Sequence, residues 1–140
     1  MTLEEFGPFL LTKSAGRTIV PDIDELAERT YWGLKRIATD TIPLRLVSQV
    51  PDGYKILRKV DSETYIRIPR KPVPADSEPL DMDSVLLDAL SLFVLAGLET
   101  ARAKVYMGMY YKEIDTYSDK LTETFLAEAT NDSSKFHVFP

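Results

Sequence analysis

The segment that most constrains the fold runs from Val85 to Leu98, because it is apolar around nearly its whole circumference. Only one of its 14 residues, Asp88, is charged. A helix that is hydrophobic on most sides must be buried on most sides, so other elements have to surround it. The run is also too short and too charged to span a lipid bilayer. It therefore predicts a central core helix.

Three further segments repeat apolar residues at helical spacing. The first covers residues 2–11, where Thr2 and Glu5 have the spacing of a capping box. The second covers residues 22–40 and opens with an acidic first turn, which suits the helix dipole. The third, residues 99–129, places a large side chain every three or four positions. These side chains are Tyr106, Tyr110, Ile114, Tyr117, Leu121 and Phe125.

The middle of the chain, residues 44–69, changes to short runs rich in β-branched residues. Residues 44–50 and 54–60 are divided by Pro51-Asp52-Gly53, which has the chemistry of a turn, and residues 64–69 continue the pattern. The pattern predicts two or three antiparallel strands. A unit of this size is not stable alone and must pack on the helices.

Together these segments predict a mainly α (α+β) fold, a helical bundle of three to four helices with a small inserted antiparallel β-hairpin or meander. The length of 140 residues is that of one domain. Its expected parts are an N-terminal arm at 1–20, a helix at 22–40, the β-hairpin region at 44–69, a Pro-rich linker at 70–80, a helical core at 81–129 and a C-terminal tail at 130–140.

Residues that usually carry catalysis or bind metals are scarce. The chain has no cysteine, and its one histidine, His137, stands without a second ligand nearby. The acids at 22–25 and 81–83 lack the spacing of a calcium loop and are expected at helix starts. Nucleophile elbows, phosphate loops and dinucleotide fingerprints are absent from the sequence. We therefore expect no catalytic residue, no metal and no cofactor.

The charges are separated along the chain. Residues 54–71 carry six basic side chains, whereas residues 72–101 carry six acidic ones and no basic one. One interpretation is a solvated hairpin beside an acidic helix start. The other is that the basic segment of one copy meets the acidic segment of a neighbour. In the second case the inter-subunit contacts are Lys55, Arg58, Lys59, Arg67, Arg70, Lys71, Asp76, Glu78, Asp81 and Asp83.

Two aromatic groups allow both a core and an interface role. Tyr106, Tyr110 and Tyr111, beside Met107 and Met109, have the composition of an interface stripe, although such stripes more often belong to the core. The tail behind the last helix contains further large apolar side chains, namely Phe136, Val138 and Phe139. It either docks on the domain itself or binds a partner.

The order of these features resembles the head-to-tail connector (adaptor) proteins of tailed bacteriophages. The stretch that carries the resemblance reads Tyr65-Ile-Arg-Ile-Pro-Arg-Lys-Pro72, a Pro/Asp linker, Leu80-Asp-Met-Asp83, Leu86-Leu-Asp-Ala-Leu90, and a final helix with Tyr110-Tyr-Lys-Glu-Ile114. Connector chains often show an Arg-x-Pro strand end, a proline linker, an acidic helix start with an Ala-Leu core and a Tyr-rich last helix. The likeness covers roughly residues 22–129, and residues 1–20 have no counterpart in it.

The resemblance implies a non-enzymatic virion protein in the neck between capsid and tail, assembled in the host cytoplasm. Its copies would form a ring, commonly dodecameric, that joins the portal protein to tail or neck proteins. DNA would pass through the channel without specific binding, which suits a net charge of −5. The portal-binding extension would map to the tail, with Lys135, Phe136, His137, Val138, Phe139 and Pro140 as contacts.

Other interpretations stay open. Another neck, stopper or tail-completion subunit would have the same sequence features. A cellular helical domain that binds a partner is an alternative of a different class. A small enzyme that uses carboxylates would need a pocket with acids of raised pKa.

Overall fold

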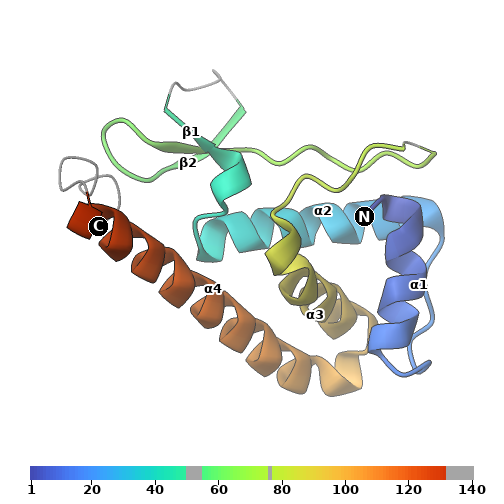
Figure 1. Ribbon diagram of the computed structural model, residues 1–140. Helices are drawn as coiled ribbons and strands as arrows, with labels where there is room; N and C mark the ends of the chain where they lie inside the picture. The colour runs from blue at the N-terminus through green and yellow to red at the C-terminus, as the bar shows by residue number, and fades with distance from the viewer. Residues whose placement is uncertain (50–54, 76, 132–140) are drawn as a thin grey trace.

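The computed structural model describes residues 1–49, 55–75 and 77–131, with side chains described as far as residue 121. Four α-helices form the body, and a small sheet lies beside it (Figure 1). The elements in chain order are α1 (Leu3–Lys13), α2 (Ile23–Asp40), η1 (Leu44–Leu46), β1 (Val47–Ser48), β2 (Ile56–Lys59), β3 (Tyr65–Arg67), η3 (Ser84–Leu86), α3 (Leu87–Leu98), η4 (Thr100–Arg102) and α4 (Ala103–Asn131). The predicted fold class is confirmed.

Helix α3 is the centre of the body and contacts α1, α2 and α4. Ala89, Leu90 and Leu95 are completely buried, as the uniformly apolar sequence predicts. The approach of α2 to α3 depends on Gly33, because a Cβ at that position would lie only 2.6 Å from Leu90 Cδ1. A glycine in a helix interior is unfavourable by itself, and here it allows two helices to pack closely.

Helix α1 corrects the expectation of an N-terminal arm. The predicted capping box is present, with Thr2 and Glu5 bonded to each other's backbone amides. Phe6 and Leu10 are fully buried in the main core. Residues 1–13 are therefore part of the helical body, because their apolar face packs on α2 and α3.

The sheet has the strand order β1-β3-β2, with β3 antiparallel to both neighbours. The first predicted run, residues 44–50, begins as the short helix η1 and is extended only in β1. Ile66 of β3 and Leu46 of η1 pack with Ala38 of α2 in a small second core. The turn expected at Pro51-Asp52-Gly53 lies outside the described residues.

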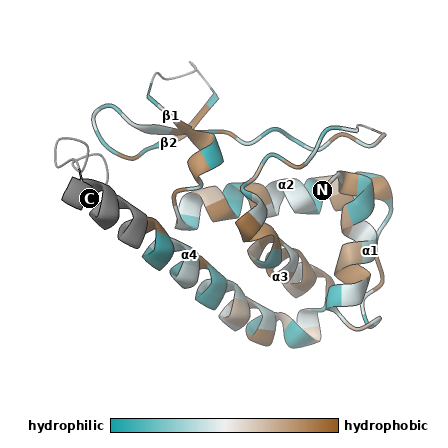
Figure 2. Cartoon of the chain, viewed as in Figure 1, coloured by the Kyte–Doolittle hydropathy of each residue, from teal (hydrophilic) through white to brown (hydrophobic). Residues whose placement is uncertain are grey.

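Helix α4 is much longer than α3, at 29 residues against 12. At a rise of about 1.5 Å per residue the difference is about 25 Å, so α4 extends well beyond the end of α3 (Figure 1). Tyr106, Tyr110 and Ile114 face the core, as their spacing predicts. Hydrophobic segments are concentrated in α1 and α3, whereas α4 mixes hydrophobic and hydrophilic turns (Figure 2).

Candidate functional site: a buried carboxylate centre and two apolar surfaces

The most strongly organised polar group is the carboxylate of Asp81, which lies in the linker before η3 and is 3% exposed. Arg67 of β3 donates to both of its oxygens, at 2.6 and 2.9 Å. Arg45 of η1 donates at 3.1 Å, and the backbone N–H of Arg70 donates at 2.8 Å. One carboxylate therefore joins η1, β3 and the two ends of the linker.

The environment of Asp81 favours its ionised form. Burial alone would raise its pKa, but the hydrogen bonds from Arg67, the Arg70 amide and Arg45 outweigh burial and hold the pKa at about 2. A carboxyl group in this state has no proton to donate near neutral pH. Its contacts are those of a residue that holds η1, β3 and the linker together.

Asp83, two residues further along the chain, has a similar role. Its carboxylate accepts from the backbone N–H of Arg45 at 3.1 and 3.3 Å and makes no side-chain cap on its own helix. The Tyr117 hydroxyl contacts the same corner, donating to the Ile42 carbonyl and accepting from the Leu44 amide, both at 3.2 Å. The acids at 81 and 83 therefore fasten η1 and the sheet to the body. Asp83 also stands at a helix start, as expected, because it is the N-cap residue of η3.

Most of the other charges assigned to contacts between copies also have partners within the chain. Arg58 donates to the carbonyls of Ala38 and Thr41, at 2.7 and 2.6 Å. Arg70 bonds the Pro79 carbonyl and lies 3.9 Å from Glu78, Lys71 pairs with Glu28, and Lys59 lies over the ring of Tyr65. Lys55 is exposed, and Asp76 lies outside the described residues.

These pairings change the interpretation of the charge pattern. The basic and acidic segments are complementary because they meet within one chain, through Arg67 and Asp81 above all. Asp81 is buried there, and an interface between copies would have to use other side chains.

A second polar centre was missed by the sequence reasoning. The buried Tyr110 hydroxyl donates to Asp40 at 2.8 Å, and Arg36 donates to the same carboxylate at 2.8 Å. Arg36 also donates to the Tyr111 hydroxyl at 2.5 Å. Burial and the bond to Asp40 raise the pKa of Tyr110. The four-residue spacing of Arg36 and Asp40 was the available signal, but the tyrosines come from a helix 70 residues away.

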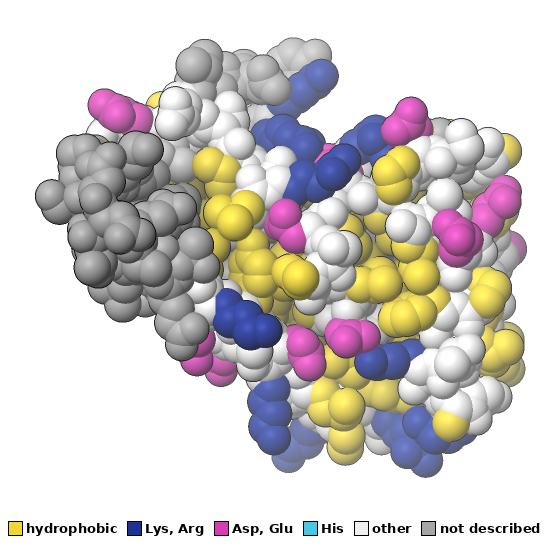
Figure 3. Space-filling model, in the orientation of Figure 1, with side chains coloured by type: hydrophobic (Ala, Val, Ile, Leu, Met, Phe, Trp, Pro, Cys, Tyr) yellow, Lys and Arg dark blue, Asp and Glu magenta, His cyan; other side chains and the backbone are white. Residues whose placement is uncertain are grey.

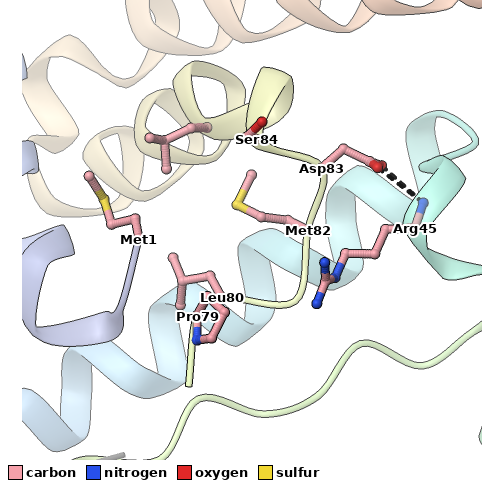
Figure 4. Close-up of a pocket in the computed structure, with 8 residues that line it drawn as sticks. Met1, Arg45, Pro79, Leu80, Met82, Asp83 and Ser84 are labelled. Atoms are coloured by element: carbon pink, nitrogen blue, oxygen red, sulfur yellow. Dashed lines mark hydrogen bonds between the residues drawn. The ribbon is translucent and has the colours of Figure 1, made fainter. Parts of the chain in front are cut away.

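Two hollows flank η1. The larger, about 350 Å³, lies where the N-terminus, the linker end and η1 meet, and is lined by Met1, Leu80, Met82 and Leu87 with Arg45, Asp83 and Ser84 (Figure 4). The smaller, about 200 Å³, lies along α4 and is lined by Leu44, Val85, Tyr117 and Leu121 with Glu113, Thr116 and Lys120. We call this second hollow the α4 groove.

Large apolar side chains remain on the surface although the core is complete. Val85 is 70% exposed, Val105 65% and Trp32 52%, and Leu44, Met109 and Tyr111 are each nearly half exposed. Hydrophobic side chains gather between α4 and the segment that precedes α3 (Figure 3). The predicted tyrosine stripe is thus divided, with Tyr106 and Tyr110 in the core and Tyr111 at the surface.

The remaining predicted site, the tail with Lys135, Phe136, His137, Val138, Phe139 and Pro140, lies outside the described residues. Within the described ranges, no group of three or more acidic or histidine side chains could hold a metal ion. No single described helix is long and apolar enough to cross a membrane, although residues 84–98 and 100–121 pass that test as a pair bent by 119°.

Comparison of the chain with protein-family models, with curated proteins and with solved structures found no match. The resemblance to phage connectors therefore depends on the order of the sequence segments alone.

Proposed function

We propose that this chain is a ring-forming head-to-tail adaptor of a tailed bacteriophage, a structural virion protein that docks on the portal and connects it to the tail. In this function the functional sites are contact surfaces between proteins. Copies bind one another side by side, and the ring binds the portal on one face and tail or neck proteins on the other. The tail segment, Lys135–Pro140, is the proposed portal contact.

The observation that supports the proposal best is the apolar surface left on a domain whose core is already filled. Val85, Val105 and Trp32 are more than half exposed, while α3 and the inner side of α4 are buried. Contiguous apolar patches on the surface of a folded domain tend to mark binding sites for other macromolecules. Helix α4, at 29 residues, also extends beyond the end of α3 (Figure 1).

The charge supports the same proposal. A net charge of −5 keeps the phosphate backbone of DNA from adhering, which a channel for moving DNA requires. The sheet is held to the body by Arg45, Arg67 and Asp81, so it is a fixed part of the subunit.

Purified chain, alone and with the portal protein encoded nearest to it, tests the proposal. Light scattering after gel filtration measures mass, and negative-stain electron microscopy shows whether closed rings form on portal particles. The proposal expects rings seated on the portal. A monomer that neither self-associates nor binds portal would favour a cellular partner-binding domain. Binding to the phage-tail side of an existing adaptor ring would favour a stopper or tail-completion subunit.

A further inference from the structure

Two of the exposed apolar surfaces lie on opposite sides of α4. Successive residues of an α-helix are separated by about 100°, so Tyr111 and Glu113 point about 200° apart and Tyr111 and Lys120 about 180° apart. Tyr111 belongs to the side of α4 next to α2, where Arg36 bonds it. Glu113 and Lys120 line the α4 groove on the other side. Val105 and Met109 precede Glu113 at four-residue steps and extend the groove side.

The first surface consists of Trp32, Arg36 and Tyr111, and we call it the tryptophan knob. Trp32 stands one turn before Arg36 on α2 and is 52% exposed. Arg36 is held between Asp40 and the Tyr111 hydroxyl, and its guanidinium lies near the rings of Phe93 and Tyr111. Tryptophan, tyrosine and arginine are the residues most enriched at the energetic centres of protein interfaces. The knob is therefore preorganised for a protein partner.

The second surface is the α4 groove, with the apolar side chains of Leu44, Val85 and Leu121 around a volume of about 200 Å³. An apolar cavity of about 150 Å³ accepts a benzene ring, so the groove has room for one indole. Glu113 gives the groove a negative charge that is complementary to the positive charge of Lys35, which follows Trp32 by three residues on α2. Arg36 is already paired with Asp40. The other cation of the groove, Lys120, has an interaction of its own in the chain.

We propose that the tryptophan knob of one copy inserts into the α4 groove of the next copy, with Trp32 between Leu44 and Val85 and the charge of Lys35 facing Glu113. The two surfaces differ and lie on opposite sides of one helix, so the contact is head-to-tail, and a joined pair of copies keeps one unused knob and one unused groove. Such heterologous contacts close into rings or continue as filaments, whereas an isologous contact stops at a dimer. The inference rests on the proposed ring and names the surfaces that build it.

Two substitutions that each block one surface provide the test. Trp32→Glu removes the knob and places a negative charge against Glu113, and Val85→Glu places a charge in the groove. Both positions are more than half exposed, so the fold is retained, as circular dichroism checks. The matched control is Ile19→Glu, at an 89% exposed position outside both surfaces.

Neither blocked variant assembles alone, because each lacks one half of the contact. Mixed together, they form a 1:1 heterodimer that grows no further, since the groove of one and the knob of the other are still intact. Truncating an interface centre raises Kd by about thirty-fold or more, which sedimentation velocity resolves. The control assembles as the wild type does.

A cysteine pair detects the same contact where association is weak, because the natural chain contains no cysteine. A variant with both Lys35→Cys and Glu113→Cys, the two positions that the proposal brings together, gives a ladder of dimers, trimers and larger species when oxidised at high concentration or on the portal. Each single variant gives dimers at most. A Lys35→Cys, Glu4→Cys pair is the control and gives no ladder.

The outcomes separate the two proposals. Rings from wild type and from both blocked variants would overturn the knob-in-groove contact and leave the adaptor proposal standing. Failure of the wild type to form rings or ladders, alone or on the portal, would overturn both. Assembly lost in both variants without a heterodimer from the mixture would show an isologous contact and would also overturn the inference.

Discussion

Replacing Asp81 by asparagine is the most direct perturbation of the carboxylate centre. The substitution keeps the size of the side chain but removes the charge that accepts from Arg67, Arg45 and the Arg70 amide. The pKa of Asp81 falls from 3.8 to about 2, and this fall is produced by those donors. At about 1.4 kcal/mol per pH unit, it corresponds to about 2 kcal/mol of folding free energy near neutral pH.

Leaving two arginines beside a neutral amide adds to this loss, because breaking a buried ion pair costs up to about 3–5 kcal/mol. Arg45 and Arg67 are themselves partly exposed and can be solvated, so we expect a total of about 2–4 kcal/mol. Urea denaturation of wild type and Asp81→Asn at neutral pH measures the difference. Asp88→Asn is the control, since its exposed pair with Lys13 contributes less than about 1 kcal/mol.

The pH dependence gives a second, independent readout. A carboxyl whose pKa is lowered by folding stabilises the native state above its unfolded pKa of 3.8, and this contribution is lost as pH falls towards about 2. The difference between wild type and Asp81→Asn should therefore narrow between about pH 4 and pH 2. A difference that stays constant over this range, or a variant as stable as Asp88→Asn at neutral pH, would refute the role assigned to Asp81.

Three further predictions follow from the packing and the tail. Gly33→Ala places a Cβ 2.6 Å from Leu90 Cδ1 and should lower the free energy of unfolding, measured with urea, by about 1–3 kcal/mol. Gly108→Ala meets no atom within 4 Å and should stabilise α4 by up to about 1 kcal/mol. Equal effects of the two substitutions would contradict the close approach of α2 and α3. Tyr110→Phe leaves Asp40 without one donor and should lower stability by about 1–2 kcal/mol, more than Tyr111→Phe at the surface, as thermal unfolding measures. Removing residues 133–140 should abolish co-sedimentation with portal particles while leaving the thermal midpoint unchanged, and retained binding would exclude the tail as the portal contact.

The helices were predictable because their signals are local. The capping box of Thr2 and Glu5, the apolar circumference of α3 and the inward spacing of Tyr106, Tyr110 and Ile114 are all contained within a few turns of sequence. The order of the strands was not predictable, since β1 pairs with β3 across an intervening strand and no local pattern specifies that pairing.

The charge pattern shows the same division between local and long-range information. Opposite charges in neighbouring segments were compatible with a solvated hairpin or with a contact between copies, whereas in the structure the two segments meet within the chain through Arg67 and Asp81. Sequence does not say whether such partners belong to one chain or to two. The side chain of Asp81 is only 3% exposed, so its partners belong to its own chain. The exposed remainder, Trp32 and Val85 among it, could be located only once the core was known.

The central position of α3 also determines when the chain can fold during synthesis. Helices α1 and α2 precede it, yet their buried side chains, Phe6 and Leu34 among them, belong to the same core as Leu90 and Leu95. The contact of Lys13 with Asp88 spans 75 residues. A nascent chain that ends in the proline linker therefore holds two amphipathic helices that can cover only part of each other's apolar surface, and the apolar core closes only after α3 has left the ribosome.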